Sequence, residues 1–104
     1  RYMRAIVFFD LPVTTAVQRK RYAQFRKFLI KDGFLMMQQS VYAKLLINNA
    51  AYQGMLTRLR NHRPPEGLVQ VLKVTERQFA SMSFIVGSRP DREEADDLEE
   101  FVVL

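Results

Sequence analysis

The sequence contains no cysteine and a single histidine among its 104 residues. Without cysteine there is no disulfide framework, no thiolate metal site and no cysteine nucleophile. No apolar run approaches the roughly 18 residues that a membrane span needs, and no secretory signal pattern is present. These absences indicate a cytoplasmic protein with no membrane partner.

The familiar catalytic motifs are missing as well. There is no glycine-rich phosphate loop, no zinc-ligand spacing and no serine triad signature, which argues against the familiar kinds of nucleotide hydrolysis. The one histidine, His62, follows a predicted helix in a basic, proline-rich neighbourhood. We interpret it as a helix cap or surface residue rather than a general base.

Acidic residues are scarce outside one short stretch. The net charge is +5, but seven of the eleven acidic residues fall within 91–100. Residues 1–90 carry 15 basic and 4 acidic residues, so their net charge is 15 − 4 = +11. This excess favours a polyanion partner and disfavours a small-molecule regulatory domain. We divide the chain into a domain over 1–90 and an acidic tail over 91–104.

The hydrophobic pattern predicts an alternation of strands and helices. The apolar run 3–9 is typical of a central strand, and a helix capped by Thr14 or Thr15 is expected to reach Lys31. Two strands over 34–37 and 40–47, a helix from Asn48 or Asn49 to about His62, and a strand over 68–75 follow. A short link over 79–82 and a further strand candidate over 83–86 complete the pattern.

The predicted order is β-α-β-β-α-β with a C-terminal strand extension, which is the α+β ferredoxin-like arrangement. In that fold two helices cover one face of a four-stranded sheet. The predicted strands are too apolar for the other face to remain in water. We therefore predict a homodimer in which two copies pack sheet against sheet.

Asp10 is the only plausible metal-binding or catalytic acid in the first 31 residues. An aspartate between a strand and Leu11-Pro12 is also ordinary turn chemistry. Alternatively, it is a ligand for Mg²⁺, which proteins hold through one or two carboxylates. One carboxylate is a poor site, whereas two copies meeting at a dimer axis would share a cation.

The first predicted helix has a basic face with no acidic residue between Val13 and Lys31. Such a face is either solvated or contacts phosphate groups without reading sequence. We favour phosphate contacts, because a solvated helix usually carries charges of both signs. The candidate nucleic-acid-binding residues are Arg19, Lys20, Arg26, Lys27 and Lys31.

The acidic tail closes with four apolar, β-prone residues. These are Phe101, Val102, Val103 and Leu104. The segment is either a frayed terminus or a strand that adds to a sheet edge in the dimer or in a partner protein.

Two sequence runs resemble one family. Residues 6–12 (IVFFDLP), with the basic helix and then 38–42 (QQSVY), resemble the small CRISPR-associated proteins of the Cas-two family. Residues 40–46 and 74–79 resemble the type II variants that accompany the Cas-nine nuclease. Phe9 departs from the family pattern, in which tyrosine is commoner before the aspartate.

The resemblance implies a function for each candidate residue. Family members are ferredoxin-like homodimers that bridge dimers of the Cas-one integrase and hold a protospacer DNA duplex for insertion into the CRISPR array. Many are also described as Mg²⁺-dependent endonucleases acting on RNA or DNA, with Asp10 as catalytic residue and metal ligand. The basic residues, with Arg77 added, would support the duplex backbone, and residues 101–104 would dock the integrase. Virulence-associated toxin ribonucleases share the fold and are a more distant alternative.

Overall fold

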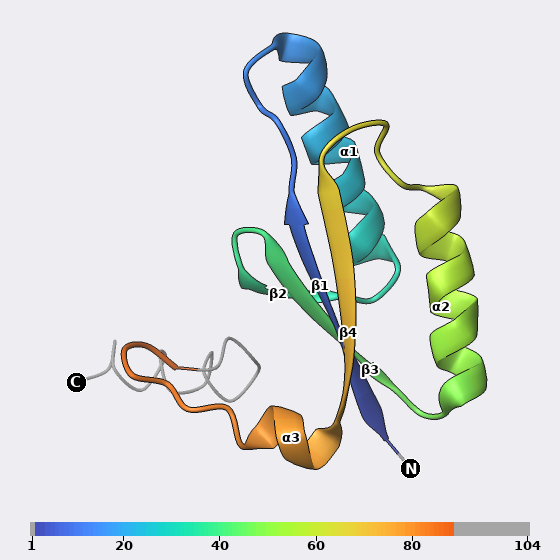
Figure 1. The fold of residues 1–104 in the computed structure, drawn as a ribbon, viewed down its shortest axis with the longest axis vertical. Helices are drawn as coiled ribbons and strands as arrows, with labels where there is room; N and C mark the ends of the chain where they lie inside the picture. The colour runs from blue at the N-terminus through green and yellow to red at the C-terminus, as the bar shows by residue number, and fades with distance from the viewer. Residues whose placement is uncertain (1, 89–104) are drawn as a thin grey trace, which may run out of the picture.

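The computed structural model describes residues 2–88, which form one antiparallel sheet with helices against it (Figure 1). The elements in chain order are β1 (Met3–Asp10), α1 (Ala16–Lys31), β2 (Leu35–Gln38), β3 (Val41–Leu46), α2 (Asn49–Asn61), β4 (Leu68–Thr75) and α3 (Glu76–Ala80). The first six elements confirm the predicted ferredoxin-like order. The acidic tail lies outside the described residues.

The sheet has the strand order β2-β3-β1-β4, and every neighbouring pair is antiparallel. The apolar strand β1 is therefore central, as its sequence predicts, and pairs along its length with β4 from Met3↔Thr75 to Asp10↔Leu68. Among the described residues, β2 and β4 form the two edges.

Helices α1 and α2 cover one face of the sheet and enclose the main core. Phe9 is at its centre: its ring lies 5.2 Å from Phe25, 5.6 Å from Tyr22 and 5.7 Å from Tyr42, measured between centroids. Aromatic pairs of this kind add about 0.5–1.5 kcal/mol each beyond their buried area. Phe9, which stands where tyrosine is commoner in the family, is therefore a residue of the packed core.

Local signals set the helix boundaries. Thr15 caps α1 in a capping box with Gln18, and the Asn48 side chain caps α2 by accepting from the Ala51 amide. Gly33 follows α1 with a φ of 103°, a conformation that glycine adopts without strain. These caps confirm the helix starts and the stop that the sequence predicts.

The opposite side of the sheet, which we call the open face, has a smaller core under α3. Phe79 of α3 is 3 % exposed and packs with Ile6 and Ala43. Arg4 of β1 holds α3 in place: its guanidinium donates to both carboxylate oxygens of Glu76, at 2.7 and 3.1 Å, and lies 4.5 Å from the Phe79 ring centroid. This contact attaches α3 to one end of the open face.

The rest of the open face is largely apolar and in contact with solvent. By strand alternation it carries Phe8, Leu72, Leu45 and Leu35, which are 37, 50, 43 and 57 % exposed. A hollow of about 440 Å³ separates part of this face from the segment 82–88. An apolar surface of this kind indicates a face that packs against another molecule.

Two expectations for the end of the domain are wrong. The chain after β4 is a helix from residue 76, because Thr75 and Gln78 form a second capping box. Residues 83–86 form no strand, and Ile85 and Val86 are each 91 % exposed. A strand needs a partner for its backbone groups, and none of the described strands pairs with this segment. Within residues 2–88, no helix is long and apolar enough to cross a membrane.

Candidate metal and nucleic-acid site

Asp10 is the last residue of β1 and is exposed at the end of the sheet. Its neighbour Phe9 points into the core beneath the helices, and strand alternation therefore places Asp10 on the open face with Phe8. The carboxylate lies next to the apolar surface that the sequence predicts to be a dimer interface.

The backbone at Asp10 is held by the loop that enters β4. Gly67 has a φ of 96°, and a Cβ atom added to it would lie 2.8 Å from the Asp10 carbonyl oxygen and 2.7 Å from Leu11 Cδ2. Only glycine permits this approach without displacement. Gly67 therefore determines how closely the start of β4 approaches the end of β1. This contact was not apparent in the sequence.

The residues around Asp10 do not by themselves form a metal site. No group of three or more histidine, cysteine, aspartate or glutamate side chains occurs within residues 2–88. Mg²⁺ is usually held by one or two carboxylates and completes its shell with water and phosphate oxygens. Asp10 fits the role of one such ligand, and in the predicted dimer the second copy of the chain would supply another.

The five candidate cations on α1 are all exposed, and none forms an ion pair with another described residue. Arg19 differs from the other four because its Nη1 donates to the carbonyl oxygens of Val13 and Thr14, at 3.2 and 2.9 Å. It fastens the turn between β1 and α1. Lys20, Arg26, Lys27 and Lys31 remain accessible to a polyanion.

Arg77 is exposed on α3, at the end of the sheet opposite the start of α1 (Figure 1). The predicted nucleic-acid-binding residues therefore do not form one continuous surface within a single chain. The predicted partner-binding residues 101–104 lie outside the described residues.

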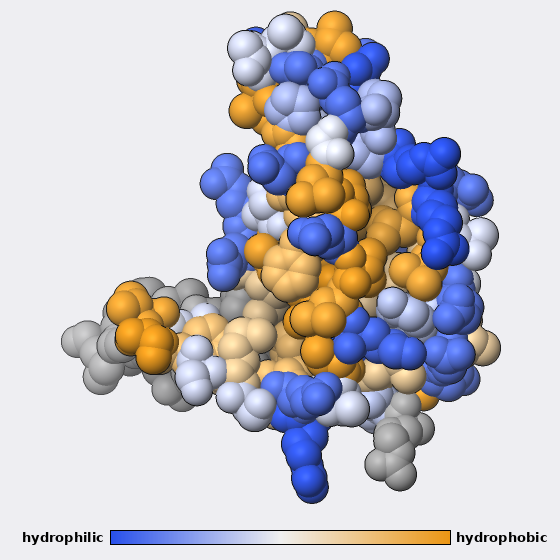
Figure 2. Space-filling model, in the orientation of Figure 1, coloured by the Kyte–Doolittle hydropathy of each residue, from blue (hydrophilic) through white to orange (hydrophobic). Residues whose placement is uncertain are grey.

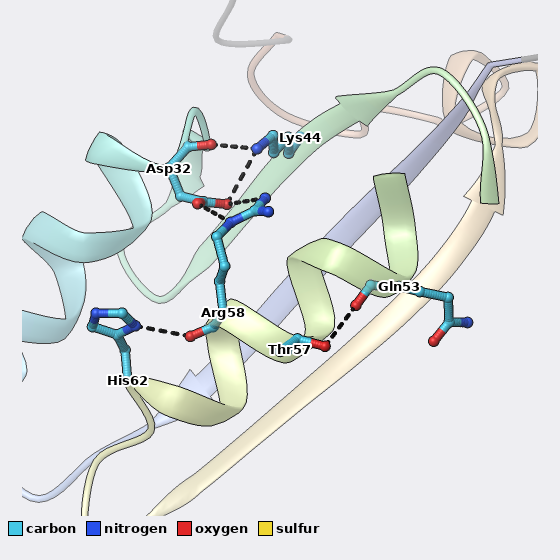
Figure 3. A network of polar contacts seen from close by, with 6 residues as sticks. All are labelled: Asp32, Lys44, Gln53, Thr57, Arg58 and His62. Carbon is cyan, nitrogen blue, oxygen red and sulfur yellow. Dashed lines mark hydrogen bonds and ion pairs between the residues drawn. The ribbon is translucent and has the colours of Figure 1, made fainter. Parts of the chain in front are cut away.

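An ion-pair cluster beside α1 was not found from the sequence (Figure 3). Asp32, the C-cap of α1, accepts from Arg58 Nε at 2.6 Å and from Lys44 Nζ at 3.1 Å. Burial acts to raise the pKa of Asp32, but the hydrogen bonds and charges of Arg58 and Lys44 outweigh it and hold the pKa below its usual value. The cluster connects α1 to α2 and β3. The guanidinium of Arg58 is engaged in this contact within the chain.

His62 is the C-cap of α2 and is exposed, as expected. Its ring stacks on Phe28 with 4.2 Å between centroids and an interplanar angle of 13°. Nδ1 lies 2.9 Å from the Arg58 carbonyl oxygen. These contacts support the interpretation of His62 as a cap.

Comparison with known proteins gives the family. The family model described as "CRISPR associated protein Cas2" matches residues 3–82, which include every described helix and strand. The chain belongs to the Cas2 family. This confirms the resemblance carried by the strand ending in Asp10 and by residues 38–42.

Three curated Cas2 relatives cover most of the chain, and each is named "CRISPR-associated endoribonuclease Cas2". The protein from Treponema denticola is 53 % identical over 85 residues, which are 82 % of this chain and 84 % of the relative. That from Streptococcus mutans serotype c (strain UA159) is 51 % identical over 84 % of this chain and 80 % of its own. That from Acidovorax ebreus is 51 % identical over 82 % and 83 %.

A solved structure described as "Crystal structure of cas2" has the same fold. It superposes with a TM-score of 0.60 over 88 % of this chain and 93 % of its own, at 22 % sequence identity. At this identity the likeness concerns the fold alone, and it agrees with the ferredoxin-like prediction.

Proposed function

We propose that this Cas2 chain acts in CRISPR adaptation as a homodimer that bridges Cas-one integrase dimers and binds the protospacer DNA duplex. The observation that carries the proposal is the combination of an apolar open face with a strongly basic body. The first supports association of two copies, and the second supports binding of a polyanion.

The dimer proposal rests on the exposed side chains of the open face. Phe8 and Leu72, from neighbouring strands, are 37 and 50 % exposed there. Burying apolar area releases roughly 25 cal/mol per Å², so a second copy packed on this face would gain from each of these side chains. Sheet-on-sheet packing would also bring the two copies of Asp10 nearer, because Asp10 shares that face.

The duplex proposal rests on the accessible cations of α1. Lys20 and Lys27 are exposed and form no ion pair with the described residues, so phosphate groups can reach them without first displacing an acidic side chain. Contacts of this kind position a duplex and depend steeply on salt.

A second candidate function is Mg²⁺-dependent cleavage of single-stranded RNA or double-stranded DNA. It is favoured by the name of the curated relatives, all called endoribonucleases, and by the exposed carboxylate of Asp10. Bound Mg²⁺ would polarise a phosphate and lower the pKa of a water molecule. In this proposal the two Asp10 carboxylates of the dimer hold the ion, since the described residues of one chain contain no group of three or more potential metal ligands.

Substitution of Asp10 separates the two functions. We expect Asp10→Ala to abolish metal-dependent cleavage while leaving duplex binding and spacer acquisition intact. If a folded, dimeric Asp10→Ala protein no longer supports spacer acquisition, the proposal that adaptation does not require the Asp10 carboxylate is contradicted. Cleavage that persists in Asp10→Ala, or after chelation of Mg²⁺, would contradict the proposed site.

Charge reversal at Lys20 and Lys27 tests the duplex contacts. Lys20→Glu with Lys27→Glu should weaken duplex binding and lower the slope of log affinity against log salt by about one for each phosphate that is no longer neutralised. The matched control, Lys20→Arg with Lys27→Arg, keeps both charges and should bind as the parent does. Equal affinity of the reversed and control variants would exclude these residues from the interface.

As part of the same adaptation function, we propose that residues 101–104 bind the Cas-one integrase. Deletion of 91–104 should reduce co-purification with the Cas-one integrase more than it reduces thermal stability. Full stoichiometric co-purification of the deletion variant would refute it.

A further inference from the structure

A hollow of about 400 Å³ lies between α1 and the loop that joins α2 to β4. Its apolar walls are Phe25 and Phe28 of α1 and Pro64 and Pro65 of the loop, and its volume is within the range of small-molecule sites. These elements are on the helix side of the sheet (Figure 1). A dimer formed through the open face would therefore leave the hollow accessible.

The hollow is lined by cations and by no acidic residue. Arg21 lines it from α1 and Arg63 from the loop. In Figure 2, strongly hydrophilic side chains cover the end of α2 that leads into this loop. Guanidinium groups bind phosphate through paired N–H donors, which is why arginine is common at phosphate sites. The charge of the lining therefore favours an anion.

Both guanidinium groups keep N–H donors for a ligand. Arg63 forms no ion pair within residues 2–88, and its Nη1 donates to the Arg60 carbonyl oxygen at 3.2 Å. Arg21 Nη1 is 3.6 Å from a carboxylate oxygen of Glu66, and both of these side chains are nearly half exposed. Exposed ion pairs contribute little to stability, so a phosphate can replace Glu66 beside Arg21.

A flat ring lies beside these cations. His62 also lines the hollow, and its ring stacks on Phe28 with 4.2 Å between centroids. Its Nδ1 lies 2.9 Å from the Arg58 carbonyl oxygen, which fixes the orientation of the ring at the end of α2 (Figure 3). His62 is nevertheless exposed, so a planar ligand can stack on the face turned away from Phe28.

The remaining lining residue suits a nucleobase. Every base has a flat aromatic face and can stack on a ring such as that of His62. The Gln24 amide lines the hollow as well, and it offers both a donor and an acceptor to the edge of a base. The hollow thus combines a surface for a base with two groups for a phosphate.

We propose that this hollow binds a nucleotide with an unpaired base, the base against His62 and the phosphate between Arg21 and Arg63. An inorganic anion would leave the ring and the apolar walls unused, and an uncharged ring compound would leave both guanidinium groups without a ligand. The base must be unpaired, because both faces of a base inside a duplex are already stacked. The site is on the opposite side of the sheet from Asp10, and it depends neither on the proposed duplex contacts nor on cleavage.

Titration of the full ¹⁵N-labelled chain, followed by backbone amide NMR signals, tests the site. Adenosine 5′-monophosphate should give saturable shifts at Gln24, Phe28 and His62. Adenosine, which lacks the phosphate, and inorganic phosphate, which lacks the base, should each bind roughly tenfold more weakly at the same amides. The absence of saturable shifts with the monophosphate, or equal affinity for either half alone, would overturn the proposal.

A free nucleotide and the terminal nucleotide of a strand share this chemistry, and a single-stranded tetranucleotide with a 5′-phosphate distinguishes them. Binding at the same amides that is tighter than that of the monophosphate supports a strand end as the ligand. Equal or weaker binding supports a free nucleotide.

Variants of the lining decide whether the contact is specific. Arg21→Ala with Arg63→Ala should weaken binding of the monophosphate by roughly tenfold or more. The matched control, Arg60→Ala with Lys73→Ala, removes the same charge from side chains that do not line the hollow and should bind as the parent does. Glu66→Gln, which removes the competitor for Arg21, should tighten binding by about two- to fivefold. Signal dispersion confirms that each variant is folded. Equal weakening by the two pairs, or weaker binding by Glu66→Gln, would overturn the proposal.

Discussion

Gly67 lies directly against the backbone of Asp10. A Cβ atom at position 67 would be 2.8 Å from the Asp10 carbonyl oxygen, and the φ of Gly67 is 96°. The residue at the tip of β1 that is proposed to bind metal is therefore held in place by a glycine 57 positions later in the sequence. The spacing of the two strand ends at this point depends on the absence of a side chain.

Replacing Gly67 tests this contact. We expect Gly67→Ala to lower the free energy of unfolding by about 1–3 kcal/mol, because alanine is strained at this φ and its Cβ would displace the end of β1. Urea denaturation measures the change. Gly54→Ala is the control: Gly54 is inside α2, its added Cβ would meet only Arg58 Nη1 at 3.5 Å, and the variant should be more stable by roughly 0.5–1 kcal/mol. Equal effects at the two glycines would contradict the strain argument.

The Asp32 cluster makes a pH-dependent prediction. The pKa of Asp32 is lowered in the folded chain, whereas an unfolded aspartate titrates near 3.9, about its ordinary value. The unfolded chain thus binds the proton more readily, so the stabilisation is complete above about pH 4 and is lost as the pH falls through the lower folded value.

Asp32→Asn should therefore lower the free energy of unfolding at pH 7 by about 1.5–3 kcal/mol, and the difference from the parent should shrink at acid pH. Denaturation curves at several pH values measure it. Glu66→Gln is the control, because its ion pair with Arg21 is exposed and 3.6 Å long. A pH-independent difference for Asp32→Asn would show that the charge of Asp32 is not responsible.

Two buried or half-buried tyrosines should respond oppositely to loss of the hydroxyl. Tyr42 is fully buried, and its hydroxyl has no hydrogen-bond partner among the described residues. Removing an unsatisfied polar group relieves a desolvation cost, so Tyr42→Phe should be neutral or stabilising by up to about 1 kcal/mol. The Tyr22 hydroxyl donates to the Gln39 carbonyl oxygen at 3.1 Å, so Tyr22→Phe should destabilise by about 0.5–1.5 kcal/mol. Thermal denaturation of the two variants compares them, and a larger loss for Tyr42→Phe would refute the assignment.

A charged side chain placed on the open face should weaken the association of two copies of the chain. Leu72→Glu places a carboxylate at a side chain that is 50 % exposed on that face, so it should leave the fold intact while shifting the proposed dimer toward the monomer. Val17→Glu, at a 56 % exposed position on α1, should leave the oligomeric state unchanged. Sedimentation equilibrium distinguishes the species, and an unchanged mass for Leu72→Glu would place any dimer interface elsewhere.

The order of the first six elements could be predicted because each has a local signal. The run 3–9 indicates a buried strand, and Thr14 or Thr15 indicates a helix start, which the structure places at Thr15. Thr75 and Gln78 form the same kind of cap at the start of α3, but this helix was not predicted, because five residues are too few to show a hydrophobic period. Residues 83–86 have strand-forming side chains, and in the single chain they lack a neighbouring strand to pair with.

The candidate site could be predicted only residue by residue. Asp10 is marked by its position after an apolar strand, whereas its contact with Gly67 depends on how two distant strands align. Likewise, Arg58 reads in the sequence as a surface cation, and only the fold brings it to Asp32, 26 residues away. Contacts between residues far apart in the chain have no local pattern from which they can be derived.

The bond between Arg4 and Glu76 has a consequence for assembly. By holding α3 over Ile6 and Ala43, it closes one end of the open face. A second molecule that settles on the sheet must therefore do so toward Phe8 and the end of β1. A surface salt bridge at one end of the sheet would in this way direct where two chains meet at the other, beside the carboxylates of Asp10.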